Sequence, residues 1–356
     1  MSPNIGGIES FIMNIYRNID RSKIQFDFLC FSPKIPFSEE ITKLGGKIYY
    51  LKSRRENYFR NKKQVYSFFK EHQEYKLVHF HLNTCSYIDP ILAASKTNKK
   101  IIVHSHNQWM GKNLRIRLLH FLNKNKIATM ADELLACSNV AGNYMFNSKK
   151  YKLIKNAIDA EKFRYNPIVR EKVRTILNIK DKFVIGHVGR FSYQKNHDFL
   201  LDIFDYVYKK NRNSILILIG SGELEEEIKN KIKRLNLEDV VLLLGNRNDI
   251  HNILQAMDVF VFPSYYEGLP ISVIEAQAAG LPCIISNNIT KDVSITKNMM
   301  FISLNESAEI WAQYALAYSK NYQRKDTISD IINSGYDIKS LVKRIEKIYT
   351  DLYYEI

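Results

Sequence analysis

The sequence is poor in cysteine and lacks long apolar runs. Four cysteines occur in 356 residues, with no Cys-x-x-Cys pair, and they are Cys30, Cys85, Cys137 and Cys283. Their spacing excludes a zinc ribbon and a disulfide-rich secreted domain, so we expect buried free thiols in a reducing cytoplasm. No apolar run approaches the ~18 residues of a membrane span, and the first residues contain no signal-peptide core.

The length and charge indicate two globular domains with different electrostatics. A chain of 356 residues with 46% hydrophobic residues is too long for one ordinary core. Residues 1–160 hold 26 Lys and Arg against 12 Asp and Glu, whereas residues 161–356 hold 26 against 25. The basic first half therefore predicts an anionic partner on that side: phosphate-rich substrate, anionic lipid or nucleic acid. Solubility alone is the alternative.

The second half reads as alternating strands and helices. Apolar runs of strand length lie at 183–189, 214–220, 240–245, 258–264 and 282–286, and helical patterns lie between them. Strands that are apolar on both faces indicate a parallel sheet covered by helices on both sides. Right-handed crossovers then predict a doubly wound, Rossmann-like α/β domain over 161–336.

The first half repeats this pattern less regularly. Strands are expected at 25–32, 47–52, 77–82, 100–106 and 133–138, and a helix at 7–19. We therefore predict a Rossmann-like domain over 1–160. An amphipathic helix over 337–354 can cover either domain, including back on the first. Ligands of such sheets bind beyond the carboxyl ends of the strands, so we expect an interdomain cleft between facing strand ends.

A pair of glutamates flanks a Gly-Leu-Pro in the stretch "YYEGLPISVIEAQ". Pro270 is expected in the first helical turn, where its missing N–H has no intrahelical partner. The free N–H groups and the dipole of that helix end favour an anion. Glu267 precedes the helix and suits sugar hydroxyls, and Glu275 can accept two hydroxyl bonds from a ribose. A charge at the helix start and a solvated helix face are the alternatives.

Two cations follow the strand at 183–189. Arg190 and Lys195 lie in one loop, so both can reach one diphosphate. Asn246 and Arg247 follow the strand at 240–245, at the same sheet edge. Solvated loop charges are the alternative for these residues. Gly6-Gly7 before a helix would allow a ligand to approach the backbone closely, or would form an ordinary turn.

Histidines alternate with other residues in "HFHL" and "HSHN". A metal site is conceivable, but no matching acidic cluster and no Asp-x-Asp pair accompany them, so we expect none. We favour a histidine that bonds substrate hydroxyls, either His104 or His106. Satisfied core histidines are expected at His79, His81 and His187.

Two basic stretches also carry aromatic and aliphatic residues, at 52–63 and 111–126. The second predicts a helix with a leucine-rich side and cations at Lys112, Arg115, Arg117 and Lys124. Such a helix can lie on anionic lipid. An ordinary amphipathic helix with a solvated basic face is the alternative.

Taken in order, the motifs "GGIES", "HSHN", "IKNAID", "GR…QKN", "GSG" and "EGLPISVIEAQ" resemble the retaining glycosyltransferases of family 4, which have the GT-B fold of two Rossmann-like domains across a cleft. The resemblance covers nearly the whole chain. Within the family, the chain resembles in particular the enzymes of bacterial capsule and exopolysaccharide assembly. It implies sugar transfer from a nucleotide-sugar, commonly a UDP-sugar, with retention and without a metal or other cofactor. It implies a lipid-linked glycan acceptor and a cytoplasmic protein peripheral to the plasma membrane.

The resemblance also assigns roles. Arg190 and Lys195 match the two cations that bind the donor diphosphate in the family. Glu267 matches the glutamate that contacts the donor sugar, and Glu275 matches the glutamate that holds the ribose. Backbone of Gly268, Leu269 and Pro270 matches the sugar and distal-phosphate contact. Gly7 matches a glycine near the diphosphate. Either His104 or His106 matches a histidine near the reacting sugar.

One departure concerns the chain start, because family members begin with a strand before the Gly-Gly. Here residues 1–5 lead straight into Gly6, so the first strand of the N-terminal sheet is expected to be missing through a truncated or misassigned start. Two other activities remain open. A nucleotide-sugar epimerase shares the fold but does not explain the basic half, and a nucleic-acid-binding protein would need a motif that the sequence lacks.

Overall fold

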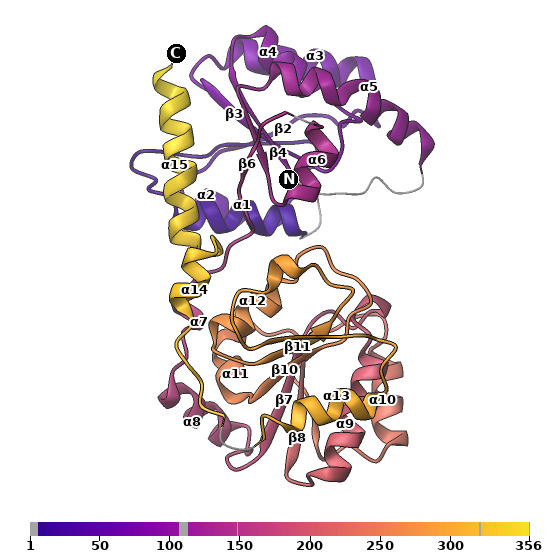
Figure 1. Cartoon of the computed structure of the whole chain (residues 1–356). Helices are drawn as coiled ribbons and strands as arrows, with labels where there is room; N and C mark the ends of the chain where they lie inside the picture. The colour runs from indigo at the N-terminus through magenta and orange to yellow at the C-terminus, as the bar shows by residue number, and fades with distance from the viewer. Residues whose placement is uncertain (1–5, 107–112, 148, 320–321, 356) are drawn as a thin grey trace. The chain divides into compact units, whose positions relative to one another are not determined.

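A computed structural model describes residues 6–106, 113–147, 149–319 and 322–355. The chain forms two compact units (Figure 1). Unit 1 comprises Met1–Ala157 and Ile338–Ile356, and unit 2 comprises Ile158–Asp337. The chain therefore leaves unit 1 after Ala157 and returns to it at Ile338.

The described residues of unit 1 form two separate parallel sheets. Strands β1 (Phe28–Cys30) and β2 (Ile48–Tyr50) form a pair. Strands β3 (Leu77–Leu82), β4 (Lys100–Ser105), β5 (Glu133–Ala136) and β6 (Lys152–Leu153) form the second sheet in that order. Among the described residues, helix α1 (Gly7–Asn18) precedes every strand.

Helices cover both faces of the larger sheet, because alternate side chains of its strands point to opposite sides. Ile102 and Leu135 face a core made with α1 and α15 (Ile338–Tyr354). Ile101, Val103 and Leu134 face a core made with the remaining long helices. These are α3 (Tyr58–Glu71), α4 (Asp89–Lys96), α5 (Leu114–Met130) and α6 (Asn139–Phe146), while α2 (Ser38–Lys43) connects β1 to β2.

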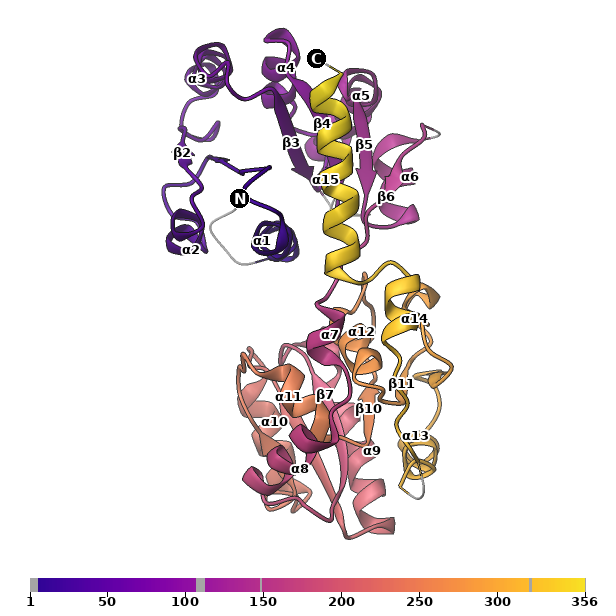
Figure 2. The ribbon, with the colours of Figure 1, turned by 90° about the vertical axis from the view of Figure 1, so that its left-hand side faces the viewer.

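The C-terminal helix α15 belongs to the fold of unit 1. It is the last of the described helices, yet it contacts α1 and β3 and runs across one face of the larger sheet (Figure 2). Ile338, Leu341, Val342 and Ile345 on its inner side are buried with residues of α1. The amphipathic pattern read from the sequence therefore corresponds to a packed face.

Unit 2 contains one six-stranded parallel sheet in the order β12-β11-β10-β7-β8-β9. Its strands are β7 (Phe183–Val188), β8 (Ser214–Ile219), β9 (Val241–Leu243), β10 (Val259–Phe262), β11 (Cys283–Ser286) and β12 (Met299–Ile302). Every residue of β7, β8, β10 and β11 is buried. This burial explains why these strands read as unbroken apolar runs.

Two helical layers enclose this sheet. One layer contains α9 (His197–Lys210), α10 (Glu225–Arg234) and α13 (Ala308–Leu316). The other contains α7 (Ala160–Phe163), α8 (Pro167–Ile176), α11 (Ile250–Ala256), α12 (Ile271–Ala278) and α14 (Ile328–Asn333). Ile158 and Asp337, at the two ends of unit 2, form a parallel β-bridge. Unit 2 therefore closes on itself where the chain enters and leaves it.

Three further findings concern the sequence predictions. Strands β6 and β12 were not predicted, since β6 has two residues and β12 lies among turn residues. The four cysteines are free thiols, and three of them are buried. None of the described helices is long and apolar enough to cross a membrane.

Candidate functional site

The candidate donor residues of unit 2 lie at the carboxyl ends of its strands. Strand β7 has β8 and β9 on one side and β10, β11 and β12 on the other. The order of connections therefore reverses between β7 and β10. Doubly wound sheets bind ligands outside the strands at such a point. The loops 189–196 and 263–270 leave the sheet there.

These two loops are tied together by hydrogen bonds. The side-chain amide of Gln194 donates to the Tyr266 carbonyl at 2.9 Å, and the Tyr265 N–H donates to the Gln194 carbonyl at 2.9 Å. The Asn196 amide donates to the Pro263 carbonyl at 3.1 Å. Asn196 has a left-handed φ of 56°, which asparagine tolerates better than most residues. The loops thus form one platform rather than two independent segments.

Lys195 and Glu267 form a half-buried ion pair on this platform. The Lys195 Nζ lies 2.7 Å from the Glu267 Oε1, and the two side chains are 15% and 8% exposed. The same Nζ lies 4.6 Å from the ring centroid of Phe262, at the end of β10. The sequence predicted separate roles for the two residues and did not predict that they pair. The pair holds a cation and a carboxylate side by side at the reversal point.

Arg190 does not join that pair. Its guanidinium lies 3.0 Å from Glu223, and its side chain is 72% exposed. Glu223 follows β8, in the loop that carries the Gly-Ser-Gly. A Cβ at Gly222 would lie 2.3 Å from the Phe191 carbonyl oxygen, so only glycine allows the loops after β7 and β8 to pack this closely. An exposed pair of this kind contributes about 0.2–1 kcal/mol, so Arg190 can leave Glu223 at little cost.

The Gly-Leu-Pro leads into α12, with one correction to the predicted start. Pro270 is the N-cap, with ψ 98°, and the helix begins at Ile271. The ring fixes φ near its observed −76°, but the extended ψ places Pro270 just before the first turn. No side chain caps this end, and the Val273 N–H donates to the Pro270 carbonyl at 3.1 Å. The N–H groups of Ile271 and Ser272 are therefore oriented outward from the helix end. Gly268 and Leu269 lie in the loop before it, where a Cβ added to Gly268 would meet nothing within 4 Å.

Glu275 lies in the second turn of α12, close to α7. None of the hydrogen bonds or ion pairs among the described residues involves its carboxyl group. Burial raises its pKa from 4.5 to about 7, and the nearby charge of Lys162 opposes that rise. The alternative of a solvated helix face therefore does not describe this residue, which is half-buried. A carboxyl group without a protein partner can accept hydrogen bonds from hydroxyl groups of a ligand.

Asn246 and Arg247 lie farther along the sheet edge. They follow β9, which is separated from β7 by β8. The Asn246 amide donates to the Ser221 hydroxyl at 2.8 Å, and the Arg247 guanidinium pairs with Asp249 at 2.7 Å. The structure thus places them beside the loop after β8 and not beside Lys195. Their part in donor binding stays a prediction.

In unit 1, Gly7 and His106 line one cavity. Helix α1 begins at Gly7, and a Cβ at that position would meet nothing within 4 Å. A Cβ at Gly6 would lie 2.9 Å from the Glu9 Oε2, so packing restricts Gly6 more than Gly7. Glu9 and His106 also line this cavity. Burial lowers the pKa of His106 to about 4, although the charge of Glu9 opposes that effect. The sequence analysis did not select Glu9, whose only signal is an acidic residue in the first turn of α1.

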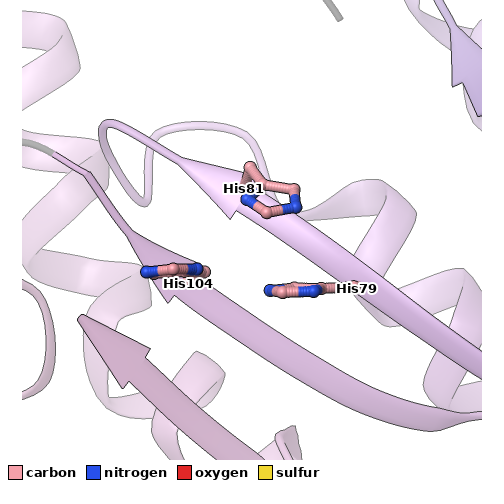
Figure 3. A group of neighbouring side chains, drawn as sticks. All are labelled: His79, His81 and His104. Atoms are coloured by element: carbon pink, nitrogen blue, oxygen red, sulfur yellow. The ribbon is translucent and has the colours of Figure 1, made fainter. Parts of the chain in front are cut away.

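His104, the other candidate, is fully buried. Its side chain has no exposed surface, and neither ring nitrogen has a hydrogen-bond partner. It lies near His79 and His81 on the neighbouring strand β3 (Figure 3). His81 shares a 2.9 Å hydrogen bond with His106, and His79 shares one of 2.6 Å with Tyr349. Between the two candidates, only His106 has access to the cavity.

The three histidines in Figure 3 are the group that most resembles a metal site. One ring nitrogen from each lies within 4.8 Å of the others. Tetrahedral zinc with Zn–N bonds of about 2.0–2.1 Å needs nitrogens about 3.3 Å apart, so the rings would have to converge. Burial lowers the pKa of His79 to about 3 and the pKa values of His81 and His104 well below 6.5. Neutral imidazoles can bind a metal, but this arrangement also suits a packed group of core histidines.

Helix α5 exposes the apolar residues of the predicted membrane-facing stretch. It runs from Leu114 to Met130, so the predicted range of 111–126 begins too early, and positions 111 and 112 lie outside the described residues. Leu114, Leu118, Phe121 and Leu122 are 75%, 61%, 55% and 59% exposed. At helical spacing these four form one stripe. Arg115 lies on one side of the stripe, and Arg117 and Lys124 lie on the other.

Two family models match the chain, one in each half. The model described as Glycosyltransferase Family 4 matches residues 5–162. The model described as Glycosyl transferases group 1 matches residues 169–299. Together they cover the α1 start, the histidine strands and the Lys195–Glu267 platform.

Curated proteins extend this match over the whole chain. The glycosyltransferase-family protein EpsF of Bacillus subtilis (strain 168) is 34% identical over 359 residues, which cover 97% of this chain and 94% of that protein. A second relative, from Escherichia coli, is a UDP-Gal:alpha-D-GlcNAc-diphosphoundecaprenol alpha-1,3-galactosyltransferase. It is 37% identical over 213 residues, covering 57% of this chain and 54% of that enzyme.

A solved structure supports the fold over the full length. The Anabaena protein HepE in complex with UDP has a TM-score of 0.79 and 20% identity, and the match covers 99% of this chain and 98% of that one. The parallel sheet of each unit, the matched family models and the full-length relative agree. The chain belongs to the family 4 glycosyltransferases and has the GT-B fold.

Proposed function

We propose that this glycosyltransferase moves a sugar from a UDP-sugar to a lipid-linked glycan, with retention of the anomeric configuration and without a metal, in capsule or exopolysaccharide synthesis. The Lys195–Glu267 pair beside the start of α12 is the observation that carries the proposal. The relatives support the substrates: the E. coli enzyme is named for UDP-Gal and a diphosphoundecaprenol acceptor, and HepE was solved with UDP-glucose.

The donor is bound through its charges and hydroxyl groups. Lys195 and the N–H groups at the start of α12 contact the diphosphate, and Arg190 swings from Glu223 to join them. Glu267, released in part from Lys195, accepts hydrogen bonds from the donor sugar. Glu275 accepts hydrogen bonds from the ribose. Cations and N–H groups fixed before the reaction stabilise charge without reorganisation, and loss of one such contact costs about 2.7–4 kcal/mol of barrier.

The transfer breaks one bond and forms another. The bond between the anomeric carbon and the phosphate oxygen breaks, and its electron pair leaves with UDP. The acceptor hydroxyl oxygen bonds to the same carbon on the same face, which retains the configuration. Its proton passes to the departing phosphate oxygen. Lys195 and α12 supply the charge stabilisation that a metal supplies in other transferases, so no metal is required.

We propose further that α5 holds the acceptor side at a membrane surface. Its exposed stripe of Leu114, Leu118, Phe121 and Leu122 carries cations on both sides. A helix of this kind lies in the interface with its apolar side in the acyl boundary. Helix α4 packs between α3 and α5, so the exposed Tyr58 and Phe59 at the start of α3 belong to the same helical layer (Figure 2). We therefore propose that this layer attaches unit 1 to the anionic cytoplasmic leaflet.

A transfer assay tests the reaction. The protein is incubated with UDP-hexoses and a polyprenyl-diphosphate-linked sugar, and released UDP and the linkage formed are measured. We expect UDP release only with acceptor, an α-linkage from an α-donor, and unchanged rates with EDTA. Conversion of the UDP-sugar without acceptor would instead identify an epimerase, and rescue of an EDTA-inactivated enzyme by Mg²⁺ would exclude the metal-free mechanism.

Vesicle sedimentation tests the membrane surface. Replacing Arg115, Arg117 and Lys124 by Gln is expected to reduce binding to anionic vesicles at low salt, while UDP affinity stays unchanged. Replacing Lys210, Lys233 and Arg234 by Gln removes three exposed cations from unit 2 and serves as the matched control. Each cation near the surface contributes about 1 kcal/mol, so only the first variant should lose most of its binding. Equal sedimentation of both variants would refute the assignment.

A further inference from the structure

The imidazole of His187 lies at the reversal point of the unit 2 sheet. His187 belongs to β7, and its side chain has no exposed surface. Its Nδ1 lies 2.9 Å from the carbonyl oxygen of Val261 in β10. A carbonyl oxygen can only accept a hydrogen bond, so Nδ1 carries the proton and donates it. The sequence predicted a satisfied core histidine; the structure confirms this for Nδ1, whereas Nε2 has no hydrogen-bond partner among the described residues.

Strands β7 and β10 separate at this residue. The register that pairs the two strands runs to Gly186 and Phe260. Beyond that point β7 still pairs with β8, through Val188, and β10 still pairs with β11, through Phe262. The sheet therefore opens between its two central strands, and the imidazole donates a hydrogen bond across the opening.

The two platform loops leave the sheet from the two sides of this opening. The loop 189–196 follows β7, and the loop 263–270 follows β10. The Asn196 amide joins them again by its hydrogen bond to the Pro263 carbonyl at 3.1 Å. The imidazole bond therefore lies between the last paired residues of the two strands and the bonds that join the two loops.

The side chain of His187 also borders that of Lys195. A Cβ at Gly189 would lie 2.9 Å from the His187 Nε2 and 3.1 Å from the Lys195 Cδ, so these two side chains share the space that a Cβ would fill. The imidazole stacks on the ring of Phe262, with the centroids 5.1 Å apart and the planes at 20°. The Lys195 Nζ lies 4.6 Å from the centroid of the same ring. One phenylalanine therefore contacts both the imidazole and the ammonium group that pairs with Glu267.

A second buried histidine lies beside His187 without a bond to β10. His197 is at the start of α9, and the centroids of the two imidazoles are 4.7 Å apart with the planes at 74°. It is 1% exposed, and neither of its ring nitrogens has a hydrogen-bond partner in the described part of the chain. His197 therefore matches His187 in residue type and burial and differs from it in hydrogen bonding.

We propose that His187 is a positioning residue for sugar transfer: its bond to Val261 and its contact with Phe262 fix the separation of the loops that carry Lys195 and Glu267. Because His187 is buried, it acts through this ion pair and not on the donor itself. A displacement of about 1 Å in a reacting group can cost about 10²-fold in rate. Burial lowers the pKa of His187 well below 6.5, so the ring adds no charge beside the lysine. The inference rests on the proposed function, since the rate concerned is that of sugar transfer.

The test separates the hydrogen bond from the packing of the ring. His187→Phe keeps a ring of similar size and removes the donor to Val261. His187→Asn places an amide N–H close to the position of Nδ1, whereas the longer side chain of His187→Gln places its amide near the position of Nε2. The matched control is His197→Phe, which makes the same change at a buried ring that lacks the bond.

Each variant is compared with wild type in the transfer assay. We expect His187→Phe to lower kcat on the order of 10²-fold, while KM for the acceptor changes little. His187→Asn should recover about tenfold of that loss, because it restores one hydrogen bond, and His187→Gln should not. His197→Phe should retain a kcat close to that of wild type. A loss that came from packing alone would be equal in the two phenylalanine variants and would not be recovered by asparagine.

Two further measurements do not depend on sugar transfer. Long-range ¹H–¹⁵N NMR should show a neutral His187 with its proton on Nδ1. Crystal structures of wild type and His187→Phe should show the loops 189–196 and 263–270 farther apart in the variant, by on the order of 1 Å at Lys195 and Glu267. If wild type gave both results but no transfer, the proposed reaction would fail, and His187 would still be the residue that spaces the loops.

Several results would overturn the proposal. A proton on Nε2 would leave the Val261 carbonyl without its donor. Equal kcat in His187→Phe and wild type, or equal losses in His187→Phe and His197→Phe, would show that the bond to β10 does not matter for transfer. If His187→Phe does not fold, the two amide variants decide, and equal activity of His187→Asn and His187→Gln would count against the bond.

Discussion

Replacing Glu275 with Gln is expected to stabilise unit 2 at high pH. Burial raises the pKa of the Glu275 carboxyl from 4.5 to about 7. A raised pKa in the folded state means that the protonated form is favoured by folding. The stabilisation is complete below pH 4.5 and is lost as the pH rises through 7. Glutamine has nearly the same shape and does not titrate, so the variant avoids this loss.

The size of the effect follows from the shift. A change of about 2.5 pH units at about 1.36 kcal/mol per unit corresponds to about 3 kcal/mol across the whole range. Between pH 5 and pH 8.5, Glu275→Gln should gain about 2–3 kcal/mol relative to wild type. In a unit of this size, 1 kcal/mol shifts the melting temperature by about 2–4 °C. Relative to the difference between the two proteins at pH 5, the melting temperature of the variant should therefore be about 4–12 °C higher than that of wild type at pH 8.5.

The assay uses a tryptophan that reports on unit 2. The chain contains two tryptophans, and Trp311 is fully buried in the α13 core. In a Trp109→Phe background, the fluorescence of Trp311 therefore follows the unfolding of unit 2 in urea. Comparing wild type and Glu275→Gln at the two pH values cancels the contributions of all other titrating groups. A double difference below about 0.5 kcal/mol would refute a buried carboxyl with a raised pKa.

The same residue gives a ligand-linked prediction that rests on the proposed donor site. Hydroxyl groups that donate to Glu275 favour its ionised form and lower its pKa. UDP binding near pH 7 should then release part of a proton. Calorimetry in two buffers with different ionisation enthalpies measures this release, and Glu275→Gln should abolish it. Unchanged proton release in the variant would assign the titration to another group, while leaving the stability prediction intact.

Further substitutions separate the half-buried pair from the exposed one and test the loop packing. Lys195→Ala leaves the half-buried carboxylate of Glu267 unpaired, so it should cost more stability in urea unfolding than Arg190→Ala, which should cost under about 1 kcal/mol. Both should lower kcat/KM, with Lys195→Ala losing about 10²–10³-fold; wild-type turnover in either variant would contradict its role on the diphosphate. Glu267→Gln keeps the shape of the loop and should lower kcat while UDP affinity, measured by calorimetry, changes little. Gly222→Ala forces a Cβ to within 2.3 Å of Phe191 and should lower the melting temperature, and an unchanged melting curve would show that the loops after β7 and β8 do not pack as described.

The fold was largely predictable because burial on both faces leaves a clear pattern. The runs at 183–189 and 214–220 became the fully buried strands β7 and β8. The terminal amphipathic stretch became α15, but no pattern within it could specify that it packs beside α1, more than 300 positions away. The start of α12 was predicted one residue early, because Pro270 is compatible with both the N-cap and the first helical position.

The site was less predictable, because spacing does not show which side chains meet. The sequence placed Lys195 and Glu267 after two strands of one predicted sheet but did not show that these strands are neighbours or that the two residues form an ion pair. The sequence could not distinguish His104 from His106, and the structure distinguishes them by burial alone. The exposed stripe of α5 shows a related limit. The sequence left open whether its leucines lie on lipid or pack as in an ordinary amphipathic helix, and only the surrounding structure reveals that Leu114 and Leu118 face solvent.

The parallel bridge between Ile158 and Asp337 has a consequence for how the protein forms during synthesis. Unit 2 is an insertion whose two ends lie at strand-pair distance, while unit 1 is built from both ends of the chain. Domains generally fold as they emerge, the N-terminal one first. Here the order is inverted: unit 2 can be complete before α15 has been synthesised, and unit 1 cannot fold fully without that helix. A stop codon anywhere in the final helix would therefore damage the first half of the protein and spare the second.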